Sequence, residues 1–287
     1  MIDALITIAV IGGSGLYRLF EPARSTSTTV RTPYGSASIT VGELGGRRVA
    51  FLTRHGAGHS VAPDSINYRA NIWALASLGV KAILSSSAVG GLSAEYPPGT
   101  LVLTDQFIDR TNGRADTFYD RGSVQHLAAA DPFCPALHRI AAAALREAGE
   151  EFAPTGTCVV IQGPRFSTRA ESRWFAAAGG HTINMTLYPE VALAAELGIG
   201  TANLSFVTDS DAGVAPSPDA AGDRAGADAG ADDVSHQLVL ERLLAAQPRI
   251  VAAIETIIRA IPDHYAPREL IPAAAIAAVL ARDTVAS

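Results

Sequence analysis

Lysine is almost missing from this chain: Lys81 is the only one among the 22 basic residues of the 287-residue sequence. A phosphate-binding loop of the G-K-[ST] type needs a lysine at its end, so this kind of loop is excluded. Any site for an anion must instead be built from arginine, histidine, hydroxyl groups or backbone N–H groups.

The chain also has few cysteines and no excess of positive charge. The two cysteines, Cys134 and Cys158, stand apart among apolar neighbours, so we expect buried thiols rather than a disulfide scaffold or a zinc site. The net charge of −6 argues against partners such as nucleic acid or an anionic membrane. Because no apolar run reaches membrane-spanning length and the N-terminus lacks a basic leader, we expect a soluble, cytoplasmic protein.

The sequence does contain many apolar residues, 48% of the total, in alternating strand-like and helix-like segments. Strands are predicted at 4–11, 80–91, 100–109, 156–166, 181–186 and 199–209, with a hairpin at 36–56. Helices are predicted at 65–79, 134–149, 168–180, 189–198 and 234–261. This order is typical of an α/β fold and predicts a mostly parallel sheet covered by helices on both faces, in a single domain over residues 1–287.

One stretch does not fit a packed core. Residues 212–233 are rich in Ala, Gly and Asp and have low complexity, which predicts a mobile surface loop. The loop directly follows two acids, so it is either a lid over a site or a neutral insertion.

Small polar groups gather where several predicted strands end. Ser14 lies in a glycine turn, Arg54 and His55 follow the hairpin, and the runs "SSSAVGG" (85–91) and "NMTLYPE" (184–190) end two more strands. Because open α/β sheets bind ligands at the carboxyl ends of their strands, this convergence predicts a phosphate pocket. Arg54 is costly to bury alone, so it binds either an external anion or a structural carboxylate.

The run "VTDSDAG" (207–213) ends a core strand with Asp209 and Asp211. Residues two apart on a strand share a face, so the two carboxyl groups lie close together. A metal site is disfavoured because no third acid or histidine stands at ligand spacing. Neighbouring carboxyl groups raise the pKa of one of them, so we predict a pair that shares one proton, with one acid donating and the other accepting.

Together, these segments closely resemble the methylthioadenosine phosphorylases of the trimeric purine nucleoside phosphorylase family. The resemblance covers residues 7 to 213 and is carried by the motifs "GGSGL", "TRHGAGHSVAPDSINYRANIWAL", "DQFIDRT", "QGPRFSTRAES", "NMTLYPEVALAAELGI" and "VTDSDAG". It implies a single α/β domain with a mixed, partly barrelled central sheet flanked by helices, and assembly as a homotrimer.

The resemblance also implies roles for individual residues. The implied phosphate-binding residues are Ser14, Arg54, His55, Ser87, Ala88 and Thr186. The implied nucleoside-binding residues are Phe166, Ser167, Met185, Asp209, Asp211, His236 and Val239, with His126 reaching in from a neighbouring subunit. Asp209 and Asp211 are implied to be the catalytic pair.

The implied reaction is phosphorolysis of S-methyl-5′-thioadenosine, or a related 5′-modified adenine nucleoside, in purine and methionine salvage. Inorganic phosphate is the co-substrate, and neither a metal nor an organic cofactor is expected. A broader purine nucleoside phosphorylase and a non-catalytic nucleoside-binding protein are the alternatives.

His236 bears on this choice of substrate. The animal methylthioadenosine enzymes have a small apolar residue at the corresponding place, whereas purine nucleoside phosphorylases have a histidine that binds the 5′-hydroxyl group. A partly exposed helical histidine without a role is the other interpretation.

Overall fold

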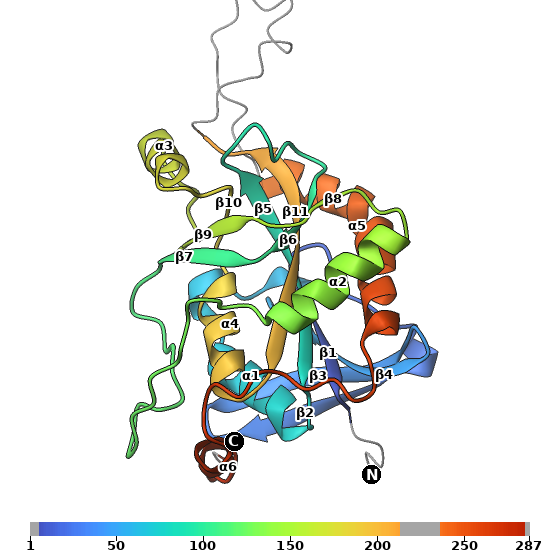
Figure 1. Cartoon of the computed structure of the whole chain (residues 1–287), viewed down its shortest axis with the longest axis vertical. Coiled ribbons are helices and arrows are strands. Elements are labelled where there is room, and N and C mark those ends of the chain that lie inside the picture. The colour runs from blue at the N-terminus through green and yellow to red at the C-terminus, as the bar shows by residue number, and fades with distance from the viewer. Residues whose placement is uncertain (1–5, 213–235, 285–287) are drawn as a thin grey trace, which may run out of the picture.

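The computed structural model describes residues 6–212 and 236–284, and its strands form one mixed sheet with helices on both sides (Figure 1). The strands are β1 (Ile8–Gly12), β2 (Thr26–Thr32), β3 (Gly35–Leu44), β4 (Arg47–Thr53), β5 (Ala82–Gly91), β6 (Leu101–Thr104), β7 (Gln106–Arg110), β8 (Phe152–Ala153), β9 (Thr157–Ile161), β10 (Thr182–Asn184) and β11 (Gly200–Ser210). The α-helices are α1 (Tyr68–Ser77), α2 (Pro135–Glu147), α3 (Arg169–Ala177), α4 (Leu187–Glu196), α5 (His236–Ala260) and α6 (Ala273–Leu280).

Strand β5 is the centre of the sheet and the point where it forks. Along one edge, its first half pairs in parallel with β1 and its last two residues pair in antiparallel with β10. Along the other edge, its whole length pairs in parallel with β11, which leads on to β6 and β8. The single α/β domain with a mixed, partly barrelled sheet is thus confirmed.

The prediction of a mostly parallel sheet is wrong in part. Strands β2, β3 and β4 form an antiparallel meander, and the β5–β10 and β6–β11 pairs are also antiparallel. For β5, β6, β10 and β11 the physical reason is that a strand buried on both faces has the same apolar sequence whichever way its neighbours run.

The sheet is buried on both faces by different helices. In β1, Ile8 and Val10 belong to an apolar cluster with residues of α2 and α5. Ala9 and Ile11, pointing the other way, belong to a cluster with residues of α1 and α4. This two-sided burial explains why β1 appears in the sequence as a continuous apolar run.

Several element boundaries differ from the sequence predictions. The hairpin predicted at 36–56 is confirmed as β3 and β4, but the strand predicted at 100–109 is two strands divided at Asp105. Helix α1 begins later than predicted, because its first turn is capped by Asn67, which accepts a hydrogen bond from the N–H of Ala70. The strand β2, rich in Thr and Ser, was not predicted.

Both cysteines are buried free thiols, as predicted. Within residues 6–212 and 236–284, no helix has the length and apolarity needed to cross a membrane. The cytoplasmic location stays a prediction. The low-complexity stretch 212–233 lies outside the described residues except for Ala212, so its mobility and its part in the domain also stay predictions.

Candidate functional site

A cavity of about 520 Å³ opens where the carboxyl ends of β1, β4, β5, β10 and β11 converge. The predicted site residues that line it are Ser14, Arg54, His55, Ser87, Ala88, Phe166, Ser167, Met185, Thr186, Asp209, Asp211 and Val239. These residues come from segments far apart in the sequence, and the forked sheet brings their strand ends together.

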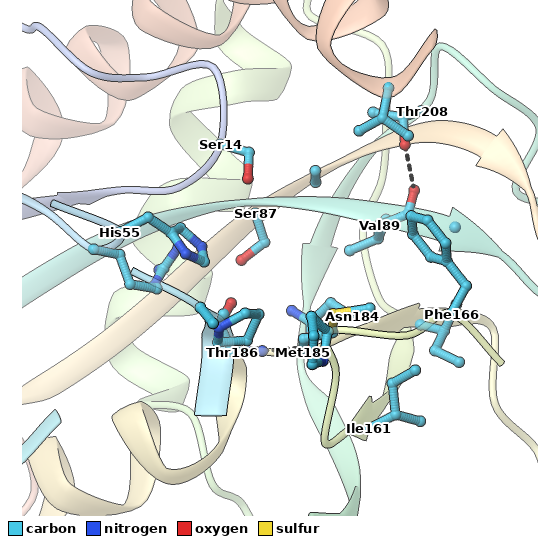
Figure 2. Close-up of a pocket in the computed structure, with 18 of the residues that line it drawn as sticks. Ser14, His55, Ser87, Val89, Ile161, Phe166, Asn184, Met185, Thr186 and Thr208 are labelled. Carbon is cyan, nitrogen blue, oxygen red and sulfur yellow. Dashed lines mark hydrogen bonds between the residues drawn. The ribbon is translucent and has the colours of Figure 1, made fainter. Parts of the chain in front are cut away.

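One end of the cavity is polar and carries several hydroxyl groups. Figure 2 shows Ser14, His55, Ser87 and Thr186 around this end; Ser87 lies within β5, and the other three follow the ends of β1, β4 and β10. Ser87 and Thr186 are buried, and Ser14 is partly exposed. Hydroxyl donors fixed in a buried concave surface are suited to holding the oxygen atoms of a small anion.

Arg54 borders this end but is paired with a buried carboxylate, Glu190 of α4. Its Nε donates to Oε2 of Glu190 at 2.6 Å and its Nη2 donates to Oε1 at 2.8 Å, while Nη1 donates to the carbonyl oxygen of Ser86 at 2.9 Å. Burial opposes the charge on Arg54, but the attraction of Glu190 outweighs it and the pKa of Arg54 is raised. The structural carboxylate is therefore present, and an anion in the cavity would share Arg54 with it.

His55 is held in one tautomer by the backbone. Its Nδ1 lies 2.9 Å from the carbonyl oxygen of Val61, and because a carbonyl only accepts, Nδ1 carries the hydrogen. Burial, with the nearby Arg54 and His59, lowers the pKa of His55 to about 4. At neutral pH the ring is therefore neutral, and Nε2 is the atom that can take up a proton.

The two predicted acids lie at the other end of the cavity, both buried. Burial is the largest cause of a raised pKa at Asp209, and the neighbouring charge of Asp211 raises it further. Thr208 donates to Oδ1 of Asp209 at 2.6 Å, which opposes the shift. Asp209 therefore holds its proton more tightly than an ordinary aspartate.

Asp211 is surrounded by hydroxyl donors. Its Oδ2 accepts hydrogen bonds from Ser167, at 2.7 Å, and from Ser172 of α3. Both hydroxyl groups donate to the same carboxylate oxygen, so Oδ2 of Asp211 acts as a hydrogen-bond acceptor. The pair therefore has one member that favours its proton and one placed as an acceptor.

A bulge in β11 sets the position of this pair. Opposite β5, Val207 pairs with Val89 and Asp209 pairs with Gly90, so that Thr208 is an extra residue. Such bulges re-aim the side chains that follow them. A side chain at Gly90 would come within 3.3 Å of Oδ2 of Asp209 and 3.4 Å of Cβ of Asp211, so the acids pack closely over this glycine.

Several lining residues were missed by the sequence reasoning. Apolar walls are formed by Val61, Pro63, Val89, Ile161, Pro164 and Ile183, and polar lining groups include His59, Asn184 and Thr208. Figure 2 shows Val89, Ile161 and Phe166 together on the side away from His55. Their only sequence signal was proximity to a predicted strand end, since an apolar residue in a strand is equally typical of the core.

Two predicted residues are not placed in the cavity. His126 is exposed on a segment without regular structure and does not line the cavity of its own chain. His236 begins α5, but its side chain lies outside the described residues, so its role stays a prediction. Among the residues that the structure describes, no group of three or more His, Cys, Asp or Glu side chains is arranged to hold a metal ion.

The forked sheet, with an anion-suited end and an acid end in one cavity, defines an α/β protein of the nucleoside phosphorylase type. The chain belongs to the phosphorylase superfamily, whose family model matches residues 7–259. Together with the relatives described next, this membership shows that the chain is a pentosyl-transferring enzyme.

Individual relatives agree with this placement. The chain is 53% identical over 210 residues to an S-methyl-5′-thioadenosine phosphorylase of Mycolicibacterium smegmatis, a match that covers 72% of this chain and 78% of the relative. It is 45% identical over 267 residues to a purine nucleoside phosphorylase of Streptomyces coelicolor, covering 89% of each chain. A crystal structure of a methylthioadenosine phosphorylase from an antarctic soil metagenomic library superposes with a TM-score of 0.79 at 36% identity, covering 97% of this chain and 100% of that one.

Proposed function

We propose that this enzyme catalyses the phosphorolysis of S-methyl-5′-thioadenosine, or of a closely related 5′-modified adenine nucleoside, to adenine and a 5-substituted ribose 1-phosphate. The observation that carries the proposal is the cavity with two different ends: hydroxyl groups, His55 and Arg54 at one, and a buried acid pair at the other. Similar proteins named as methylthioadenosine phosphorylases support this class of substrate.

At the polar end we place inorganic phosphate. Ser14, Ser87 and Thr186 donate hydrogen bonds to it, together with the N–H of Ala88, and Arg54 contributes positive charge. Neutral His55 accepts a hydrogen bond at Nε2 from a protonated phosphate oxygen and, because its pKa is lowered to about 4, leaves the proton on the phosphate.

At the acid end we place the purine base. As the bond between the base and C1′ of the ribose breaks, its electron pair moves onto the purine and C1′ becomes cationic. Protonated Asp209 donates to N7 of the purine and stabilises this charge, while Asp211 accepts from the 6-amino group. A phosphate oxygen then forms the new bond to C1′, and none of these steps calls for a metal or an organic cofactor.

The ribose and its 5′-substituent lie between the two ends. Met185 and Phe166 form walls of this region, and Val239 of α5 lines it as well. We infer that the enzyme is a homotrimer in which His126 completes the site of a neighbouring subunit, since it is exposed and does not line the cavity of its own chain.

A broader purine nucleoside phosphorylase is the second candidate. The similarity to the Streptomyces coelicolor enzyme, which extends over more of this chain than the match to the mycobacterial one, favours it. The acid pair argues against it, because Asp211 accepts from a 6-amino group and repels a 6-oxo group.

The test is a panel of nucleosides incubated with and without phosphate, with release of free base as the readout. We expect adenine from methylthioadenosine only when phosphate is present, and a lower kcat/KM for inosine. Replacement of His236 by Val then reports on the 5′-hydroxyl: a changed preference between methylthioadenosine and adenosine places His236 in the site. Equal release of adenine without phosphate contradicts the proposed reaction.

A further inference from the structure

A row of buried polar side chains runs through the sheet behind the cavity. It consists of Thr104 on β6, Asn203 and Ser205 on β11, and Ser85 and Ser87 on β5, all buried. In the sheet register, Asn203 lies beside Ser85 and opposite Thr104, and Ser205 lies beside Ser87. Only Ser87 has a part in the proposed chemistry, so the other four need an explanation.

The hydrogen bonds of this row all run in one direction. Nδ2 of Asn203 faces the carbonyl oxygen of Ser85 at 3.2 Å, and because a carbonyl only accepts, this contact fixes the orientation of the amide. The amide oxygen then accepts from Ser205 at 2.6 Å. The hydrogen of Ser205 is thereby used, so in its 3.1 Å contact with Thr104 the threonine is the donor.

The direction matters at Ser87, where the row reaches the cavity. One hydrogen of Nδ2 of Asn203 is donated to Oγ of Ser87 at 3.1 Å, and the other is shared between the carbonyl oxygen of Ser85 and its Oγ, which lies at 2.9 Å. An amide nitrogen cannot accept a hydrogen bond, so the hydrogen of Ser87 remains for another acceptor. Ser87 lines the polar end of the cavity between Ser14 and Thr186 (Figure 2).

We propose that Asn203 is a positioning residue that keeps the Ser87 hydroxyl as a hydrogen-bond donor to phosphate. This inference rests on the proposed function, because it concerns the same phosphate site. Without the amide, the Ser87 hydroxyl is free to turn its hydrogen toward the strand and present its lone pairs to the anion. A hydrogen bond to a charged group is among the stronger ones in proteins, so its loss is measurable.

The most direct test is Asn203→Asp, which keeps the shape but replaces the donor by an acceptor. The carboxylate takes the hydrogen of Ser87 and adds a negative charge near the anion, so we expect KM for phosphate to rise about 10-fold or more. KM for the nucleoside should stay within about twofold of the parent, because the base end is untouched. Thr201→Val, at an equally buried position two residues earlier on β11, is the matched control and should keep the parental KM for phosphate.

Asn203→Ser tests the same point if the aspartate variant does not fold. Combined with Ser87→Ala, it should add no further rise in KM for phosphate, because Asn203 acts through the Ser87 hydroxyl. Parental KM in the Asn203 variants, or fully additive rises in the double variant, would overturn the inference. An unmodified enzyme whose activity does not depend on phosphate would overturn the proposed function itself, before any variant is made.

Discussion

At the scale of single residues, the acid pair is defined by its surroundings more than by its sequence spacing. Asp209 and Asp211 stand two residues apart, yet Asp209 has a raised pKa through burial and Asp211 accepts two serine hydroxyl groups. The sequence predicted the pair and a shared proton. It did not predict that burial would be the larger cause, or that Ser172 of α3 would join Ser167.

The different surroundings of Asp209 and Asp211 predict that replacing both acids changes which purine base the enzyme prefers. Asp209→Asn combined with Asp211→Ala removes both groups that we propose recognise a 6-aminopurine, so kcat/KM for methylthioadenosine should fall by about 100-fold. The same variant should gain activity on inosine, because the amide introduced at position 209 donates to a 6-oxopurine. The measurement is kcat/KM for both nucleosides, and an equal fall for both would show that the acids do not select the base.

The lowered pKa of His55 predicts that the free energy of unfolding depends on pH. Its pKa is about 4 in the folded protein and about 6.5 in the unfolded chain, so the unfolded chain binds more protons between these values. This contribution to stability is complete above about pH 6.5 and is lost as the pH falls toward 4.

At about pH 4.5, the free energy of unfolding should be lower than at pH 7 by on the order of 2 kcal/mol because of His55 alone. The variant His55→Asn cannot titrate, so its free energy of unfolding should fall less than that of the parent between pH 7 and this value. Urea unfolding at both pH values measures the difference. Parallel losses in parent and variant would mean that His55 is not held neutral by the fold.

At the scale of elements, the Arg54–Glu190 pair joins the end of β4 to α4. Removing one partner of a buried ion pair leaves an uncompensated charge, so Glu190→Ala should lower the free energy of unfolding by about 3–5 kcal/mol. Glu255→Ala, which breaks the more exposed pair with Arg259 on α5, is the control and should cost less than about 1 kcal/mol.

Phosphate binding gives a second test of the Glu190→Ala variant. If Arg54 also serves the anion, the Glu190→Ala protein has a guanidinium free to bind it, and phosphate should raise its melting temperature more than that of the parent. An equal rise in both proteins would show that Arg54 has only a structural role.

Strand ends were predictable from the sequence, but their pairing was not. Glycines mark where β1 and β5 stop, and the serines near these ends, Ser14 and Ser87, line one site. The antiparallel approach of β10 to the end of β5 depends on contacts between residues about ninety positions apart. Asn203 was missed because a polar residue within a strand carries no sign of what it faces.

At the scale of the whole molecule, we expect a trimer in which neighbouring subunits share their sites. His126 is exposed and lies outside the cavity of its own chain, so His126→Ala should lower kcat/KM about 10-fold only through a neighbouring subunit.

Mixed trimers test the sharing. When His126→Ala and Asp209→Asn chains are unfolded together and refolded at equal amounts, about a quarter of the sites combine an intact cavity with an intact neighbouring His126. Activity above that of either variant alone is expected. Activity equal to the mean of the two variants would mean that each site belongs to one chain.

The central claim is that phosphate, and not water, captures the ribose. Phosphorus NMR of a reaction containing methylthioadenosine and inorganic phosphate measures this directly. We expect a sugar 1-phosphate signal to grow at the same rate as free adenine is released, with an equal loss of inorganic phosphate. Release of adenine without any sugar phosphate would contradict the account.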